Sequence, residues 1–285
     1  MRISKMFVPV FAGTTLALAF SGTARADDAP AWGLHGFGDV SVKNDYITPR
    51  GLVVTDKGTT TQILDGLVLV SPGGVAFTAG TWTDLNPGFK DNNISALNEF
   101  DFFFGVSARV LPRVEAGVQY VQFVSGQPSV AFHDERNIEF SVKYHDGAKG
   151  APFTINPYAK FFWAVDGDST VVTGHHGKTF DIELGAGPAY STPDFTLSAP
   201  TWITLGPTSF WSRTDTGGNA GVFSTGLKGS VPLKFVKKGA GASAYLQVQY
   251  YHLINDNLVT AESILTSGVP KRDKCVFGGG ISFGF

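Results

Sequence analysis

The sequence predicts an all-β protein: a single closed antiparallel transmembrane β-barrel of about 12 strands, with short periplasmic turns and long extracellular loops. Three observations support this prediction. Residues 273–285, DKCVFGGGISFGF, alternate apolar side chains with lysine, glycine and serine. Turn-rich connections along the chain alternate between short and long. No run of about 18 apolar residues follows the amino-terminal segment, which argues against a helical membrane protein.

The strands are predicted from alternation with a period of two. Successive side chains of a β-strand point to opposite faces, so one face becomes apolar while the other stays polar or small. Phe100, Phe102 and Phe104, for example, alternate with Glu99 and Asp101. We predict strands at residues 36–47, 61–70, 74–84, 97–109, 113–124, 136–145, 152–164, 179–190, 195–205, 220–235, 242–254 and 274–285.

The connections between these segments differ in length in a regular order. Proline and glycine make the short ones tight turns, while the long ones are polar. Strict alternation is typical of a bacterial membrane barrel, in which one rim carries turns and the other carries loops. It places both chain ends on the side of the short turns. The short connections are 71–73, 110–112, 146–151, 191–194 and 236–241, and the long ones are 48–60, 85–96, 125–135, 165–178, 206–219 and 255–273.

The charged faces of the strands are expected to point inward. A Lys or Arg on the lipid side at mid-membrane costs roughly 2–4 kcal/mol, and a carboxylate also carries a cost. Aromatic rings near strand ends suit the headgroup level, and we expect Tyr46, Tyr144, Phe161 and Trp163 there. Asp65 does not fit the pattern, because it shares its parity with Ile63, Leu67 and Leu69.

The amino-terminal residues 1–26 have the features of a cleaved signal peptide. Arg2 and Lys5 precede an apolar segment, and Ala24-Arg25-Ala26 supplies a small-x-small cleavage pattern. The barrel domain is then expected to span residues 27–285. It retains 19 basic and 24 acidic residues, a formal charge of −5, which does not suit a nucleic-acid-binding protein. The single cysteine, Cys275, excludes an internal disulfide and is expected to behave as a small hydrophobic residue.

Residues 36–105 resemble the TorF-like family of outer-membrane porins. The features that match are the strand 39–46, Arg50-Gly51-Leu52, Gln62, Gly66, Ala79-Gly80-Thr81-Trp82, and a strand with Glu99 and Asp101. Ile47-Thr48-Pro49 separates Tyr46 from Arg50, which departs from the closer spacing in the family. The resemblance implies a porin-type barrel and adds no further chemistry.

The parity of the strands places a set of charged residues inside the barrel. Acids outnumber bases in this set, so an open lumen would favour cations. The alternative is a filled lumen in which acids and bases pair. Twelve strands lie between filled eight-stranded barrels and sixteen-stranded porins, so strand number does not decide. Arg50 is a candidate constriction residue or a solvated residue at a loop base. The predicted pore-lining residues are Asp39, Lys43, Asp45, Glu99, Asp101, Glu115, Glu139, Lys143, Lys160, Asp181, Glu183 and Lys228.

These features predict a barrel in the outer membrane of a Gram-negative bacterium that passes small polar or charged solutes passively, with weak cation preference. The expected partners are outer-membrane lipid, lipopolysaccharide, small solutes, and the assembly machinery that reads a carboxy-terminal strand ending in Phe285. No catalytic residue, metal or cofactor is expected, and the oligomeric state stays open. One alternative is a lipid-modifying enzyme with His252 as its base. Another is a closed structural or adhesive barrel that acts through its loops.

Overall fold

The computed structural model describes residues 32–56, 58–88, 96–125, 134–147, 151–167, 178–212, 217–235, 241–265 and 269–285. The predicted signal peptide, residues 1–26, lies outside these ranges and stays a prediction. No helix in the described ranges is both long enough and apolar enough to cross a membrane.

The molecule is a closed antiparallel barrel of 12 strands, as the alternation predicts. Three short segments, β9, β12 and β13, continue the neighbouring strands β10, β11 and β14 toward one end of the barrel. The wall consists of β1 (Gly33–Lys43), β4 (Thr60–Val70), β5 (Ala76–Leu85), β6 (Leu97–Leu111), β7 (Val114–Ser125), β8 (Glu135–Tyr144), β9 (Phe153–Thr154), β10 (Tyr158–Gly167), β11 (Thr179–Ala186), β12 (Ala189–Ser191), β13 (Thr196–Ser198), β14 (Thr201–Leu205), β15 (Ala220–Pro232), β16 (Gly241–Leu253) and β17 (Asp273–Gly284).

The ring closes because the first strand pairs with the last. Strand β1 is antiparallel to β17 from Phe37 opposite Gly284 to Lys43 opposite Gly278. The backbone N–H of Gly36 also donates to the carbonyl of Phe285 at 2.9 Å. Among the described residues, each of the 12 wall strands is thus paired on both sides, while the short extension β9 pairs with β12 alone.

The two faces of the wall differ in polarity. Large apolar side chains are exposed on the outside, among them Phe104, Val118, Val142 and Phe277. Charged side chains on the opposite parity are buried, as Asp101 and Asp181 are. This is the reverse of a soluble protein and is the pattern expected for a barrel surrounded by lipid.

Asp65 is an exception on the outer face. It lies in the middle of β4, is exposed, and accepts a hydrogen bond from the Thr81 hydroxyl on β5 at 2.8 Å. The paired hydroxyl satisfies one carboxylate oxygen, which reduces the cost of a polar group at this position.

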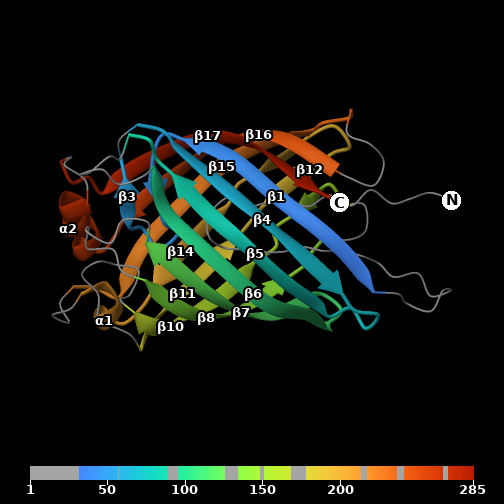
Figure 1. Ribbon diagram of the computed structural model, residues 1–285, viewed down its shortest axis with the longest axis horizontal. Coiled ribbons are helices and arrows are strands. Elements are labelled where there is room, and N and C mark those ends of the chain that lie inside the picture. Colours follow the sequence, from blue (N-terminus) through green and yellow to red (C-terminus); the bar gives the residue numbers. More distant parts are fainter. Residues whose placement is uncertain are drawn as a thin grey trace.

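The connections alternate in length around the barrel, as predicted. We call the rim with residues 71–75, 112–113, 145–152, 192–195 and 233–240 the short-turn end, and the opposite rim the long-loop end. Two helices lie at the long-loop end, α1 (Thr208–Trp211) and α2 (Asp256–Leu265), and the carboxy-terminus lies at the other end (Figure 1). The sequence pattern predicts neither helix.

Prolines interrupt three neighbouring strands near the short-turn end. Pro157, Pro188 and Pro200 separate β9 from β10, β11 from β12 and β13 from β14. A proline lacks the N–H that the ladder needs. Their carbonyls still accept hydrogen bonds from the adjacent strands, from Tyr144, Ala199 and Gly226 at 2.8–3.0 Å, so the wall stays continuous.

A charge on the apolar exterior tests this arrangement. Val118 lies outward in the middle of β7, and Val118→Arg is expected to lower the free energy of unfolding by roughly 2–4 kcal/mol. Leu111→Arg, at the β6–β7 turn, is the matched control and is expected to cost about 0–1 kcal/mol. Urea unfolding in lipid vesicles measures both. Equal losses at the two positions would contradict a lipid-facing exterior.

Candidate functional site: a hairpin across the lumen

The first long loop folds into the barrel as a small hairpin. Its strands are β2 (Tyr46–Ile47) and β3 (Val53–Thr55), which pair with each other rather than with the wall. The turn between them is closed by the Thr48 and Leu52 backbones, and Gly51 adopts a φ of 91° that favours glycine. All residues from Tyr46 to Thr55 are buried. The predicted first strand, 36–47, is therefore too long, because the wall strand ends at Lys43.

The hairpin crosses the lumen from one side of the ring to the other. It begins beside β1, and in the ring order β10 lies opposite β1. The Trp202 indole on β14 donates to the Pro49 carbonyl at 2.9 Å, and Arg50 reaches side chains on β8 and β11. The turn is thus anchored to the wall that faces its origin.

Arg50 ends in a group of acids and aromatic rings on that wall. Its guanidinium lies 3.1 Å from Asp181, 3.7 Å from Glu135 and 3.8 Å from Glu139. Its central carbon lies 4.4 Å from the centroid of the Phe162 ring and 5.5 Å from that of Phe123. We call these five wall residues the Arg50 cage. A guanidinium suits such a site because it forms hydrogen bonds in its plane and stacks through its face.

Tyr46 holds the base of the hairpin against the acidic side of β6. Its hydroxyl donates to Glu99 at 2.7 Å, and Asp101 lies buried on the same face of that strand. Its ring stacks at a tilt on Trp82, with centroids 5.3 Å apart. The prediction that Tyr46 lies at the headgroup level is therefore wrong: the ring is inside the barrel. The predicted strand 36–47 runs past Lys43, where the wall strand ends, and therefore places Tyr46 in the wall.

A second cluster of polar side chains lies on the inner wall near the place where β1 pairs with β17. Lys43 donates to Gln62 at 2.5 Å, and Asp84 accepts from Thr60 and, at 2.9 Å, from Asn98. Tyr245 donates to Asp39 at 2.7 Å. Lys228 lies 3.5 Å from the centroid of the Tyr245 ring, so two bases accompany the two acids here. At the Arg50 cage two bases, Arg50 and Lys160, accompany four acids, since Lys160 lies 3.5 Å from Glu183.

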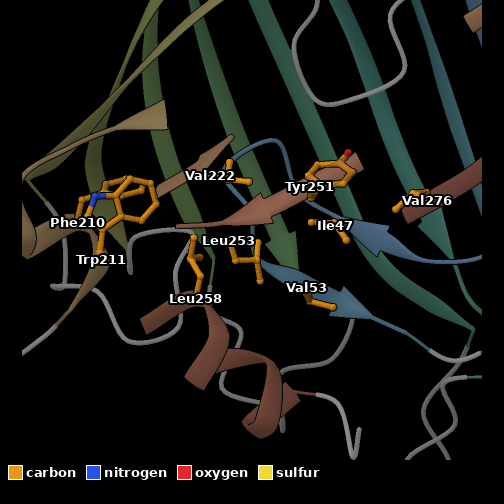
Figure 2. Packing of buried hydrophobic residues seen from close by; sticks show 9 residues of the cluster. All are labelled: Ile47, Val53, Phe210, Trp211, Val222, Tyr251, Leu253, Leu258 and Val276. Carbon is orange, nitrogen blue, oxygen red and sulfur yellow. The ribbon is translucent and has the colours of Figure 1, made fainter. Parts of the chain in front are cut away.

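Helix α2 covers the hairpin at the long-loop end. Leu258 of α2 packs with Val53 of β3, Leu253 of β16 and Val222 of β15 in one apolar cluster (Figure 2). The Glu262 carboxylate is fully buried, forms an ion pair with Lys274, and accepts the Lys271 N–H at 2.9 Å. Among the described residues, the hairpin is therefore packed between α2 and the wall at the long-loop end.

An open cavity lies at the other half of the barrel. Ser107, Glu115 and Lys143, near the short turns, line it together with Ser141, Tyr158 and Lys160. Glu139 of the Arg50 cage also lines this cavity. Glu139 is thus the member of the cage that borders the cavity at the short-turn end.

The predicted pore-lining residues all lie on the inner side or at its rim. Asp45 follows the end of β1 and belongs to the first loop, so its placement does not come from strand parity. The buried ones are Asp39, Lys43, Glu99, Asp101, Glu139, Lys160, Asp181, Glu183 and Lys228, and the half-buried ones are Asp45, Glu115 and Lys143.

Several members of the site were missed. Glu135 was assigned to a loop, although it shares its parity with Glu139 and begins β8. Phe162 shares the parity of Lys160, and Asp84 that of Trp82. Extending the predicted strand 136–145 by one residue, and applying parity to rings as well as to charges, would have found them.

His252 has a partner that the sequence did not reveal. Its Nδ1 lies 2.8 Å from Asp273, which also accepts a hydrogen bond from Tyr250 at 2.5 Å. The strand register places His252 between Phe223 and Asp273. A lipid hydrolase of the kind considered above needs a serine beside its histidine, and neither register neighbour is one.

One comparison with a solved structure supports the fold. A NanC porin structure matches with 9% identity over 86% of this chain and 98% of that chain, with a TM-score of 0.51. An outer membrane channel from Pseudomonas putida F1 matches at 11% identity, 92% and 100% coverage, and a TM-score of 0.49. The outer membrane channel DcaP of Acinetobacter baumannii matches at 10%, 89% and 97%, with 0.42. No family model and no curated protein matches the chain.

The hydrogen bond from Tyr46 to Glu99 is expected to stabilise the hairpin. Tyr46→Phe leaves one buried carboxylate oxygen without its donor, and should lower the free energy of unfolding by about 1–3 kcal/mol. Tyr190 is an exposed ring at the short-turn end, so Tyr190→Phe is the control and should leave the free energy of unfolding unchanged. Urea unfolding followed by tryptophan fluorescence measures both variants. Equal stability of the Tyr46 variant and the parent would contradict the hairpin's placement.

Proposed function

We propose that this protein is an outer-membrane channel for passive diffusion of small polar or charged solutes, with a weak preference for cations. One observation carries the proposal: a closed barrel with an apolar exterior encloses a lumen lined with charged side chains. Such a wall supplies a polar path through hydrocarbon, and the sign of its charge selects among ions. The likeness to the NanC porin is consistent with this.

The orientation and targeting belong to the same proposal. The short turns face the periplasm and the long loops face outward, as in bacterial barrels generally. The resemblance of residues 36–105 to the TorF-like porins points to the same location. Export uses the signal peptide of residues 1–26, and assembly reads the last strand with Phe285.

The hairpin acts as the constriction and gate of this channel. It crosses the lumen, and the long-loop half above it is packed with apolar side chains. Passage therefore requires the hairpin to move away from the opposite wall. Arg50, the predicted constriction residue, makes the contact that has to break.

Selectivity arises from the excess of acids near the constriction. Glu99, Asp101, Glu135, Glu139, Asp181 and Glu183 are buried there, together with Arg50 and Lys160. An excess of carboxyl groups over basic groups along the lumen favours cations over anions.

Removal of the hairpin tests the gate. The protein in a planar bilayer should give discrete conductance steps, and replacing residues 46–55 by a short Gly-Ser linker should raise the step size several-fold. The same kind of linker in place of the turn at residues 71–75 is the control and should leave the step size unchanged. Silence of both the parent and the hairpin variant in repeated reconstitutions would contradict the channel.

Charge substitutions test selectivity. Under a KCl gradient the reversal potential should show cation preference, and Glu139→Gln with Asp181→Asn should move it toward zero. Asp65→Asn removes an acid from the outer face of the wall and should leave the potential unchanged. An anion-selective parent, or an equal shift in the Asp65 variant, would contradict an origin of selectivity at the cage.

A further inference from the structure

We propose that the Arg50 cage is a binding site for organic cations with a guanidinium or primary ammonium head, and that Arg50 occupies it as a tethered substitute for such a solute. This deepens the proposed function, on which it rests only for the route by which solutes reach the cage. The site itself is a feature of the wall.

The walls of the cage come entirely from barrel strands, whereas its occupant comes from a loop. Phe123 lies on β7, Glu135 and Glu139 on β8, Phe162 on β10, and Asp181 on β11. These strands pair with their neighbours along their length, so the five side chains keep their places without the hairpin. Loss of one loop side chain would empty the cage and leave its walls in place.

The cage holds more carboxyl groups than its single occupant can pair with closely. Three carboxylates surround one guanidinium, and two of the three distances, 3.7 and 3.8 Å, exceed hydrogen-bond length. Glu135 Oε2 and Asp181 Oδ2 are buried, lie outside the ion pairs with Arg50, and have no hydrogen-bond partner among the described atoms. Buried oxygens of this kind call for a donor. A free cation, unconstrained by a hairpin backbone, can approach them more closely than Arg50 does.

The mixture of rings and acids defines the class of ligand. Phe162 and Phe123 offer ring faces, which attract guanidinium and organic ammonium groups by cation–π interaction. The carboxylates accept in-plane N–H donors, and a guanidinium supplies several. Anions are repelled by the same acids. Sodium and potassium have no donors and no planar face, so they gain less from this site.

The opening toward the short-turn end provides an approach. Glu139 lines both the cage and the cavity beside Lys160 and Tyr158. A small cation therefore reaches the cage from that cavity without crossing the apolar cluster at the long-loop end. Competition between the solute and Arg50 would release the hairpin turn from the wall.

The test uses the full-length protein in detergent and methylguanidinium at millimolar concentration. In isothermal titration calorimetry Arg50→Ala is expected to bind methylguanidinium about tenfold or more tightly than the parent, whose cage is occupied. Arg50→Ala combined with Phe162→Leu and Asp181→Asn should lose this gain. Tetramethylammonium, which has no N–H donor, should bind the Arg50→Ala protein more weakly than methylguanidinium does.

Heat-modifiable migration on gels shows whether each variant has formed its barrel. If Arg50→Ala does not fold alone, methylguanidinium during refolding should restore the folded band, and Arg50→Gln serves as a second variant. The proposal is overturned if folded Arg50→Ala binds no more tightly than the parent, if the triple variant binds equally well, or if neither Arg50 variant responds to the ligand.

The binding assay needs no current, so it separates this proposal from the channel. If the protein binds methylguanidinium after Arg50 is removed but never conducts, the binding site is supported and the channel is contradicted. A protein that conducts but does not bind methylguanidinium after Arg50 is removed would support the channel and overturn the binding site.

Discussion

Ring closure is the constraint on which the rest of this structure depends. In hydrocarbon an unpaired backbone N–H or carbonyl costs several kcal/mol, so a sheet there has to have no free edge. The pairing of β1 with β17 meets this requirement. Once the ring is closed, the alternation of side chains divides the sequence into an apolar exterior and a charged interior. The chemistry of the interior follows from that division.

The enclosed charges determine how the lumen is filled. Buried carboxylates are costly without partners, and breaking a buried ion pair by removing one partner is strongly destabilising. Arg50 supplies a positive charge to three of them, and Lys43 and Lys160 supply others near the wall. The hairpin is thus drawn across the lumen by electrostatics at its tip and held at its base by apolar packing under α2. Two different forces act on its two ends.

Much of the wall could be predicted from the sequence because its rule is local. Phe100, Phe102 and Phe104 facing out, and Glu99 and Asp101 facing in, require only a period of two. The inward turn of the first loop could not be predicted this way, since Arg50 meets Glu135 and Asp181 from distant parts of the chain. One local signal was present: Leu52-Val53-Val54 is an apolar run inside a loop expected to be polar. An apolar run of this kind is more stable when it is removed from water, and here it is buried inside the barrel.

The position of α2 in the chain has a consequence for biogenesis. The helix that covers the hairpin comes directly before β17, the strand that completes the ring. The cover over the hairpin and the closure of the ring therefore depend on the same carboxy-terminal part of the chain. A nascent polypeptide that stops before α2 would lack both the helix that packs on the hairpin and the strand that pairs with β1.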